Sequence, residues 1–293
     1  MSKTPAKLMS VYPVLFLGVI AISFASILIK FCQAPAMVIA SYRMSFATLF
    51  FAVTAGVRRV NPLASFCRRD LFFALLSGLF LCLHFATWIT SLKYTSVASS
   101  VVLVATAPVF VALASFIFLK QKPTILVLVS IFITILGAFI LSIENLATGE
   151  NLFLGDLLAL VGAIGAAGYY LVGRELRARI DTVAYVSVVY FATALFLVII
   201  TMTLRFPFFE YPPKVFLLLF LIAFVPQVLG HTSFNWALKY VSASLVTIVT
   251  LGEPIGASIL AYFLLGEKMS VLQLFGGLLI LTGVASAILA ERR

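Results

Sequence analysis

Long apolar runs separated by short polar stretches make up most of this chain. A helix needs about 20 apolar residues to cross a bilayer, and the pattern predicts ten such helices. Most of the stretches between them are short, so we expect neighbouring helices to be antiparallel and closely packed, with no soluble domain. The expected spans are 12–29, 36–57, 71–91, 97–119, 124–143, 157–173, 182–204, 215–236, 241–265 and 270–289.

The composition agrees with a membrane protein that crosses the bilayer several times. Of the 293 residues, 63% are hydrophobic and 10% are charged, which is far from the composition of soluble domains. The net charge of +10 is compatible with nucleic-acid binding. However, the basic residues lie in short loops between apolar runs rather than on one face of a domain. We therefore expect the lipid bilayer as the surroundings of the chain and no nucleic-acid partner.

Lysine and arginine residues are divided unequally between the two sides of this arrangement. One side carries 14 of them, including Arg58 and Arg179, whereas the other carries 5, among them Lys30 and Lys268. Cytoplasmic loops are enriched in lysine and arginine. The distribution therefore predicts that both termini are cytoplasmic.

The sequence also matches itself when it is shifted by 146 residues without a gap. The shift places residues 92–94 on 238–240, Pro108 on Pro254 and Gly137 on Gly283. We infer a duplication into residues 1–146 and 147–293, each with five spans, and the odd number inverts the second unit in the membrane. The predicted fold is an all-α membrane protein of ten transmembrane helices in two inverted five-helix repeats, an arrangement typical of transporters.

A carboxylate and a helix break coincide in the stretch 251–256 (LGEPIG) of the ninth expected span. Glu253 lies near the middle of the membrane, where an uncompensated carboxylate is costly. It is either a group that binds protons or substrate, or a group that fixes the fold by hydrogen bonding to a neighbouring helix. Its repeat counterpart is Ala107, so its role belongs to one half. Pro108 and Pro254 correspond, and we expect these helix breaks to act in gating.

Arg43 is a second charged residue at membrane depth, about 10 Å along the second span. A guanidinium presents a two-pronged donor that fits a carboxylate or another anionic group of a substrate. The alternatives are that Arg43 reaches back to the outer surface or pairs with Glu253.

Polar residues recur every four positions in the eighth expected span, after Pro226: Gln227, His231 and Asn235. This spacing places them on one helix face, which we expect to point into a cavity or toward a partner helix. His84 and His231 occupy corresponding spans and are interpreted either as helix–helix hydrogen bonders or as proton carriers. Trp88 lies deeper than the other tryptophan and is a candidate for the wall of a pocket.

Several chemical motifs are absent from the sequence. It contains no G-x-x-x-x-G-K-[ST] nucleotide motif, no H-E-x-x-H zinc motif and no G-x-S-x-G nucleophile motif. With two histidines and one carboxylate inside the expected spans, an acid, a base and a nucleophile at one depth are hard to assemble. We therefore expect no enzyme activity, no metal and no cofactor, and any transport would depend on a gradient or on exchange.

Nearly the whole chain resembles the EamA-type branch of the drug/metabolite transporter superfamily. The residues that carry the likeness are 42–43 (YR), 93–96 (KYTS), 251–254 (LGEP) and 265–268 (LGEK). The resemblance implies an alternating-access permease of the inner membrane with a cavity between its halves, and places Arg43 and Glu253 at positions of the family pattern. Members often carry a tryptophan midway along spans one and six, where this chain has residues 22–24 (ISF) and 168–170 (GYY).

Together these features predict a permease that exports amino acids or related small metabolites, for which we take a monomer as the starting assumption. The alternatives are efflux of drugs or hydrophobic cations, with Glu253 as the counter-charge, and an intramembrane enzyme or receptor. Neither of the last two needs access from both sides, so an inverted repeat disfavours them. The expected substrate-binding residues are Arg43, Trp88, Gln227, His231, Asn235 and Glu253, and the expected gating residues are Pro108 and Pro254.

Overall fold

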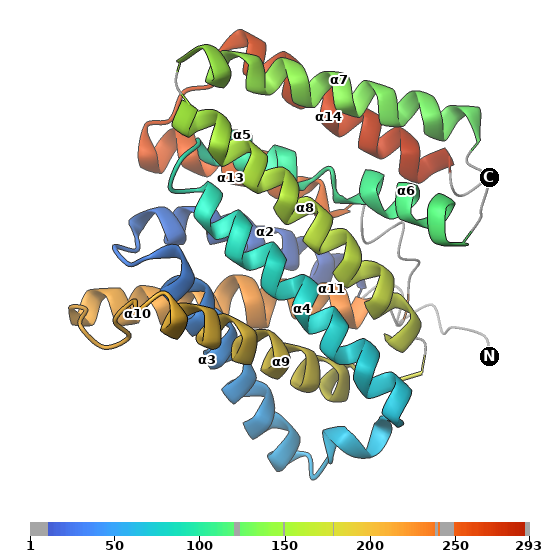
Figure 1. Cartoon of the computed structure of the whole chain (residues 1–293), viewed down its shortest axis with the longest axis vertical. Helices are drawn as coiled ribbons and strands as arrows, with labels where there is room; N and C mark the ends of the chain where they lie inside the picture. Colours follow the sequence, from blue (N-terminus) through green and yellow to red (C-terminus); the bar gives the residue numbers. More distant parts are fainter. Residues whose placement is uncertain are drawn as a thin grey trace.

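The structure is a computed structural model that describes residues 11–119, 124–148, 150–177, 179–237, 240 and 249–290. Residues 238–239 of the repeat and the first part of the expected span 241–265 lie outside the described residues. The elements are α2 (Val11–Phe31), α3 (Ala36–Val57), η1 (Pro62–Ser65), α4 (Arg68–Ser91), α5 (Val97–Val104), α6 (Ala107–Leu119), α7 (Ile125–Thr148), α8 (Glu150–Arg177), α9 (Thr182–Thr203), α10 (Pro213–Ile222), η2 (Ala223–His231), α11 (Thr232–Ala237), α13 (Gly252–Leu265) and α14 (Val271–Ala290) (Figure 1).

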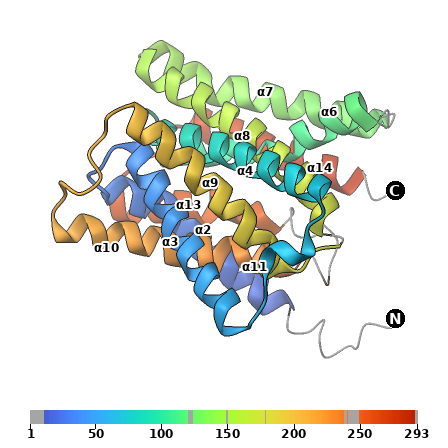
Figure 2. The same cartoon turned by 60° about the horizontal axis from the view of Figure 1, so that its bottom comes forward.

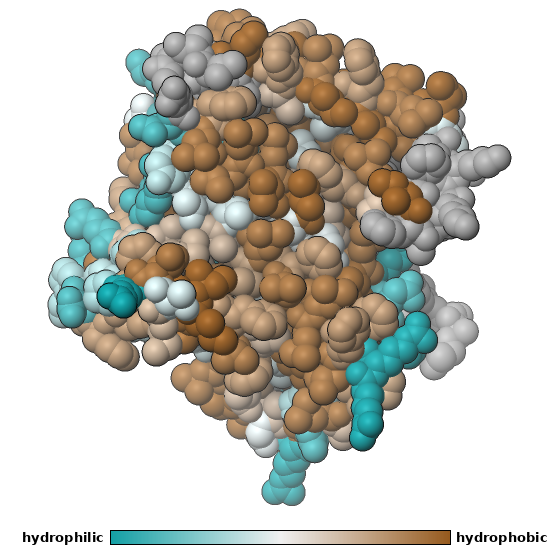
Figure 3. Space-filling view, in the orientation of Figure 1, coloured by the Kyte–Doolittle hydropathy of each residue, from teal (hydrophilic) through white to brown (hydrophobic). Residues whose placement is uncertain are grey.

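The prediction of an all-helical membrane protein is confirmed. Among the described residues, six helical segments are long and apolar enough to cross a membrane, and shorter apolar helices accompany them. Large apolar side chains such as Phe16, Phe132 and Phe263 are exposed on the outside of the bundle. The face seen in Figure 3 is mostly hydrophobic, with hydrophilic residues gathered along its margins. This is the surface expected of a bundle surrounded by lipid, whereas the count of ten spans stays a prediction.

Helices are interrupted just before both prolines of the repeat. A turn at Ala105 and Thr106 divides the expected span 97–119 into α5 and α6, and Pro108 is the second residue of α6. A turn at Leu251 likewise precedes α13, where Pro254 is the third residue. Proline is tolerated in the first turn of a helix, where its missing N–H group has no partner to lose, but not in the interior. The prolines therefore fix where each new helix begins.

A third interruption was not predicted. Between α10 and α11 the backbone forms a wider π-helix, η2, with Pro226 inside it. Proline cannot donate the hydrogen bond of its turn, and a π-helix shifts the pairing by one residue. This shift rotates the residues after the interruption relative to those before it.

Helix contacts recur when each helix is replaced by its counterpart in the other half of the chain. α7 and α14, which correspond under the offset of 146 residues, run side by side, as do α3 and α9 (Figures 1 and 2). The contact of α4 with α8 has its counterpart in the contact of η2 with α2, and that of α5 with α8 has its counterpart in α13 with α2. A two-fold relation between the halves predicts such paired contacts.

Glycines in α7 and α14 show the same relation at the level of single residues. A Cβ atom added to Gly137 would lie 2.8 Å from the carbonyl oxygen of Gly276, and one added to Gly283 would lie 2.9 Å from that of Ser130. Gly137 and Gly283 are 146 positions apart, as are Ser130 and Gly276. One close approach therefore maps onto the other with the offset of the sequence repeat.

Candidate functional site

A cavity of about 80 Å³ lies where elements of both halves meet. Pro108 and Pro254 both line it, so each half contributes a helix break to its wall. Pockets for drug-sized ligands typically have volumes of about 300–1,000 Å³. In this conformation the cavity is therefore too small for most metabolites, and binding would require its walls to separate. Its polar and aromatic lining consists of His84, Trp88, Tyr169, Tyr170, Gln227, His231, Phe234, Thr250 and Glu253.

Glu253 belongs to the cavity wall. It lies in the first turn of α13, where the positive end of the helix dipole favours a carboxylate. Gly252 and Gly256 on either side bring α13 close to α2, because a Cβ atom at these positions would crowd Val19 and Ser23. Within the described part of the chain, Glu253 forms no ion pair. Close glycine packing thus presents the carboxylate to the cavity.

Arg43 of α3 is completely buried and does not line the cavity. Its Nε–H group donates a hydrogen bond of 2.9 Å to Oε1 of Gln227. Its guanidinium carbon lies 4.3 Å from the centre of the Phe85 ring and 5.6 Å from that of Trp88, at distances typical of cation–π contacts. Arg43 therefore neither reaches the protein surface nor forms an ion pair with Glu253 in this structure.

The two terminal nitrogens of Arg43 are buried without a hydrogen-bond partner. Buried donors without acceptors are costly. The Nε hydrogen bond and the aromatic rings hold the guanidinium in place while both terminal groups remain available. These two groups are the donors that a carboxylate or another anionic group would bind if it reached Arg43 from the cavity.

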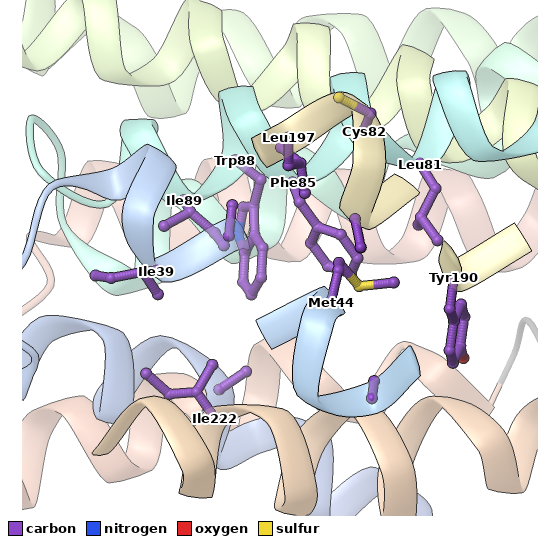
Figure 4. Close-up of a cluster of buried hydrophobic side chains, with 14 of the residues drawn as sticks. Ile39, Met44, Leu81, Cys82, Phe85, Trp88, Ile89, Tyr190, Leu197 and Ile222 are labelled. Atoms are coloured by element: carbon purple, nitrogen blue, oxygen red, sulfur yellow. The ribbon is translucent and has the colours of Figure 1, made fainter. Parts of the chain in front are cut away.

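Trp88 and His84 form an aromatic pair on α4 that faces the cavity. Their rings are nearly parallel, at an angle of 8° and a centroid distance of 5.7 Å. His84 Nδ1 donates to the carbonyl oxygen of Gly162 over 2.9 Å, which is a helix–helix hydrogen bond to α8. Figure 4 shows Trp88 and Phe85 pointing from α4 toward the segment of α3 that carries Met44. The pair thus supplies an aromatic wall next to the buried arginine.

The polar residues expected on one face of the eighth span contact the cavity and a partner helix. Gln227 and His231 line the cavity, but Asn235 does not. Instead, Asn235 Nδ2 donates a long hydrogen bond of 3.4 Å to the hydroxyl of Tyr169, which itself lines the cavity. Gln227 and His231 lie within η2, whereas Asn235 follows it in α11. The polar residues thus face the cavity at Gln227 and His231 and a partner helix, α8, at Asn235.

The profile of the EamA-like transporter family matches residues 9–143 and again residues 153–289. The chain belongs to the EamA-like transporter family. The match to the family in two successive segments covers nearly the whole chain, and it confirms the resemblance drawn from the motifs.

Several relatives of this EamA-like chain are themselves named transporters. An uncharacterized transporter of Archaeoglobus fulgidus is 27% identical, over 83% of this chain and 85% of its own length. The uncharacterized transporter YyaM of Bacillus subtilis is 26% identical, over 69% of this chain and 68% of its own. The riboflavin transporter ImpX of Fusobacterium nucleatum is 23% identical, over 80% and 82%. A protein of known crystal structure shares the fold, with a TM-score of 0.69, 16% identity and coverage of 97% of this chain and 99% of its own.

Some cavity residues had a signal in the sequence and others had none. Ile22, Tyr169 and Tyr170 line the cavity at the positions where EamA-type proteins often carry tryptophan. Phe85, which lies under the Arg43 guanidinium, had no polar character or motif to single it out. The contact of Phe85 with Arg43 depends on which helices pack together, so it could be found only from the structure.

Proposed function

We propose that this EamA-like chain is an alternating-access permease of the inner membrane that exports amino acids or related small metabolites, driven by a gradient or by exchange. Ten membrane-spanning helices form two inverted five-helix units, residues 1–146 and 147–293, with both termini in the cytoplasm. The family membership and the long apolar helices support a membrane transporter.

The observation that carries the substrate proposal is the pair of oppositely charged side chains beside one cavity. Arg43 has two terminal nitrogens without partners, and Glu253 in the cavity wall forms no ion pair with any residue that the structure describes. A zwitterion carries a group for each of them, because its carboxylate can accept from Arg43 and its ammonium can donate to Glu253. Gln227 and His231 supply further polar contacts, Trp88 packs against the substrate, and Asn235 supports the wall through Tyr169.

Pro108 and Pro254 are the gating positions of this proposal. Each begins a new helix at the cavity wall, one in each half. An interruption of the hydrogen-bond ladder lets the segments on either side change their angle at little cost. Opposite movements at the two breaks would open the cavity first to one side of the membrane and then to the other.

Counterflow with purified protein tests the proposal. Liposomes that contain the protein and are loaded with one candidate substrate should take up its labelled form faster than liposomes without protein. The uptake rate should saturate as the concentration of the substrate increases. The panel contains neutral amino acids, their amides without a carboxylate, and riboflavin, the compound in the name of ImpX. Transport of amino acids but not of their amides supports a role for Arg43. Counterflow of no compound in the panel would remove the support for an exporter of small metabolites.

A second candidate is efflux of hydrophobic cations or drugs. It is favoured by the fact that Glu253 lines the cavity while Arg43 does not. In that case Glu253 is the counter-charge of the substrate, and the aromatic side chains hold its apolar part. Uptake that increases with the positive charge of otherwise similar compounds would decide for this candidate and against amino acids.

A further inference from the structure

The chain direction changes sharply at the end of α13. Gly266 adopts a left-handed conformation with φ of 70°, and the N–H group of Glu267 donates back to the carbonyl oxygen of Ala261 over 3.3 Å. Residues other than glycine adopt this conformation at a cost. The glycine thus ends the helix and turns the next residue, Glu267, back across the bundle.

Glu267 joins three elements at this end of the bundle. Its Oε2 accepts a hydrogen bond of 2.8 Å from the N–H group of Val97, the first residue of α5. Its Oε1 lies 3.6 Å from Nζ of Lys30 at the end of α2. Lys30 in turn donates to the carbonyl oxygen of Thr95 over 3.0 Å. The carboxylate of the second half therefore binds both a helix start and a lysine of the first half.

Both contacts of the Glu267 carboxylate, with Val97 and with Lys30, are favourable in their surroundings. The N–H groups in the first turn of α5 have no partner within their own helix, and the positive end of the helix dipole attracts a carboxylate. The side chains of Lys30 and Glu267 are 25% and 24% exposed, so water screens this pair less than a fully exposed one. The two contacts share one carboxylate, so loss of Glu267 removes both.

The helices α5 and α13, which Glu267 connects, also form walls of the cavity. α5 contributes Val101 and Val104 a few residues after Val97, and α13 contributes Glu253 at the end opposite to Glu267. At the other end of the bundle Arg179 donates to Asp70 over 2.9 Å. Both ends of the described bundle are thus held by ionic contacts between the halves, which agrees with the small size of the cavity.

The geometry points to Glu267 and Lys30 as a gate that closes the cavity at the Lys30 end and opens when the carboxylate leaves Val97 and Lys30. This role rests on the proposed alternating-access function. Movement of α13 away from α5 cannot occur while Glu267 holds both the start of α5 and the end of α2. Glu267 and Lys30 act through the position of these helices and do not touch the substrate.

Thiol labelling tests the gate without any substrate. A chain in which Cys32, Cys67 and Cys82 are replaced by alanine receives a single reporter, Ala105→Cys, in the cavity wall. A maleimide that cannot cross membranes is added to cells and, separately, to inverted vesicles. Lys30→Met should raise the labelling rate about fivefold at one membrane face only, as expected for loss of a single ionic contact. Glu267→Ala, which also loses the hydrogen bond from Val97, should raise it further at the same face. Glu267→Gln, which keeps an acceptor for Val97 and loses the charge, should give a smaller increase.

The control is Lys268→Met, which removes an exposed lysine next to Glu267 and should leave the rate unchanged. Equal labelling of all variants and the parent would overturn the gate. So would an equal increase at both membrane faces, because that result means a loosened bundle rather than a gate at one end. Thermal unfolding in detergent identifies variants that fold. If labelling behaves as expected but no compound shows counterflow, the gate stands and the proposed substrates are wrong.

Discussion

Arg43 is fixed by Gln227: the Nε–H group of the arginine donates to Oε1 of the glutamine over 2.9 Å, and Gln227 also lines the cavity. The two residues come from α3 and η2, in different halves of the chain. Gln227 occupies Nε and leaves both terminal nitrogens of Arg43 without a partner. This one hydrogen bond therefore joins the buried guanidinium to the cavity wall and connects the two halves of the chain.

The first prediction concerns Arg43→Lys. Lysine keeps the positive charge but loses the Nε hydrogen bond and the two-pronged donor. Hydrogen bonds to charged groups contribute about 1.5–3 kcal/mol, so KM for an amino acid in counterflow should rise about tenfold or more. Arg58→Lys, which makes the same exchange at an exposed position after α3, should leave KM unchanged. An unaltered KM in Arg43→Lys would exclude Arg43 from the binding site.

The second prediction concerns Glu253→Gln. Glutamine has a similar shape but cannot bind and release a proton. If Glu253 couples transport to protons, flux driven by a pH gradient should be abolished, while exchange at equal pH continues. Flux is measured in liposomes with an imposed pH gradient, with Glu210→Gln in the exposed loop before α10 as the control. Retention of pH-driven flux by Glu253→Gln would exclude this role.

The third prediction uses the native cysteines. Cys67 is exposed, whereas Cys32 and Cys82 are buried. Burial raises the pKa of the Cys32 thiol to about 11, so at pH 7.5 it carries almost no reactive thiolate. A maleimide should therefore label Cys67 in the folded protein, and all three cysteines after denaturation in detergent. Labelling is counted by mass spectrometry.

The same residue tests the orientation in the membrane. Because Cys67 lies in a loop that we place in the cytoplasm, a maleimide that cannot cross membranes should label it in inverted vesicles and not in intact cells. Cys67→Ser is the control that should remove the signal. Labelling of Cys67 in intact cells would reverse the proposed orientation.

Much of the fold could be predicted because its signals are local. Apolar runs identify helices, and a proline within a run indicates an interruption, as before Pro108 and Pro254. The repeat was visible in the sequence because residues such as Gly137 and Gly283 recur at a constant offset. In the structure these two glycines occupy the same kind of close helix contact. Each of these features needs only neighbouring residues or a constant offset along the chain.

The candidate site was harder to predict because it depends on contacts between distant segments. The sequence singled out Arg43 but not its partners, since Gln227 and Phe85 reach it from two other elements. The sequence left open whether Gln227, His231 and Asn235 face a cavity or a partner helix, and only the packing places Asn235 against Tyr169 of α8. A proline signals an interruption, but how the backbone adapts to it is decided by the surrounding helices.

The fourth prediction concerns the close approach of α7 and α14. Alanine at Gly137 or at Gly283 would place a methyl group within 3.0 Å of backbone atoms of the other helix, and such overpacking typically costs about 1–3 kcal/mol. Both variants should therefore unfold at lower temperature in detergent, by similar amounts, because the two contacts are related by the repeat. Gly56→Ala is the matched control: nothing lies within 4 Å of its added Cβ atom, and alanine favours a helix, so its stability should be equal or higher. If all three variants unfold like the parent, the glycines do not determine this contact, and the equivalence of the two helices loses its support.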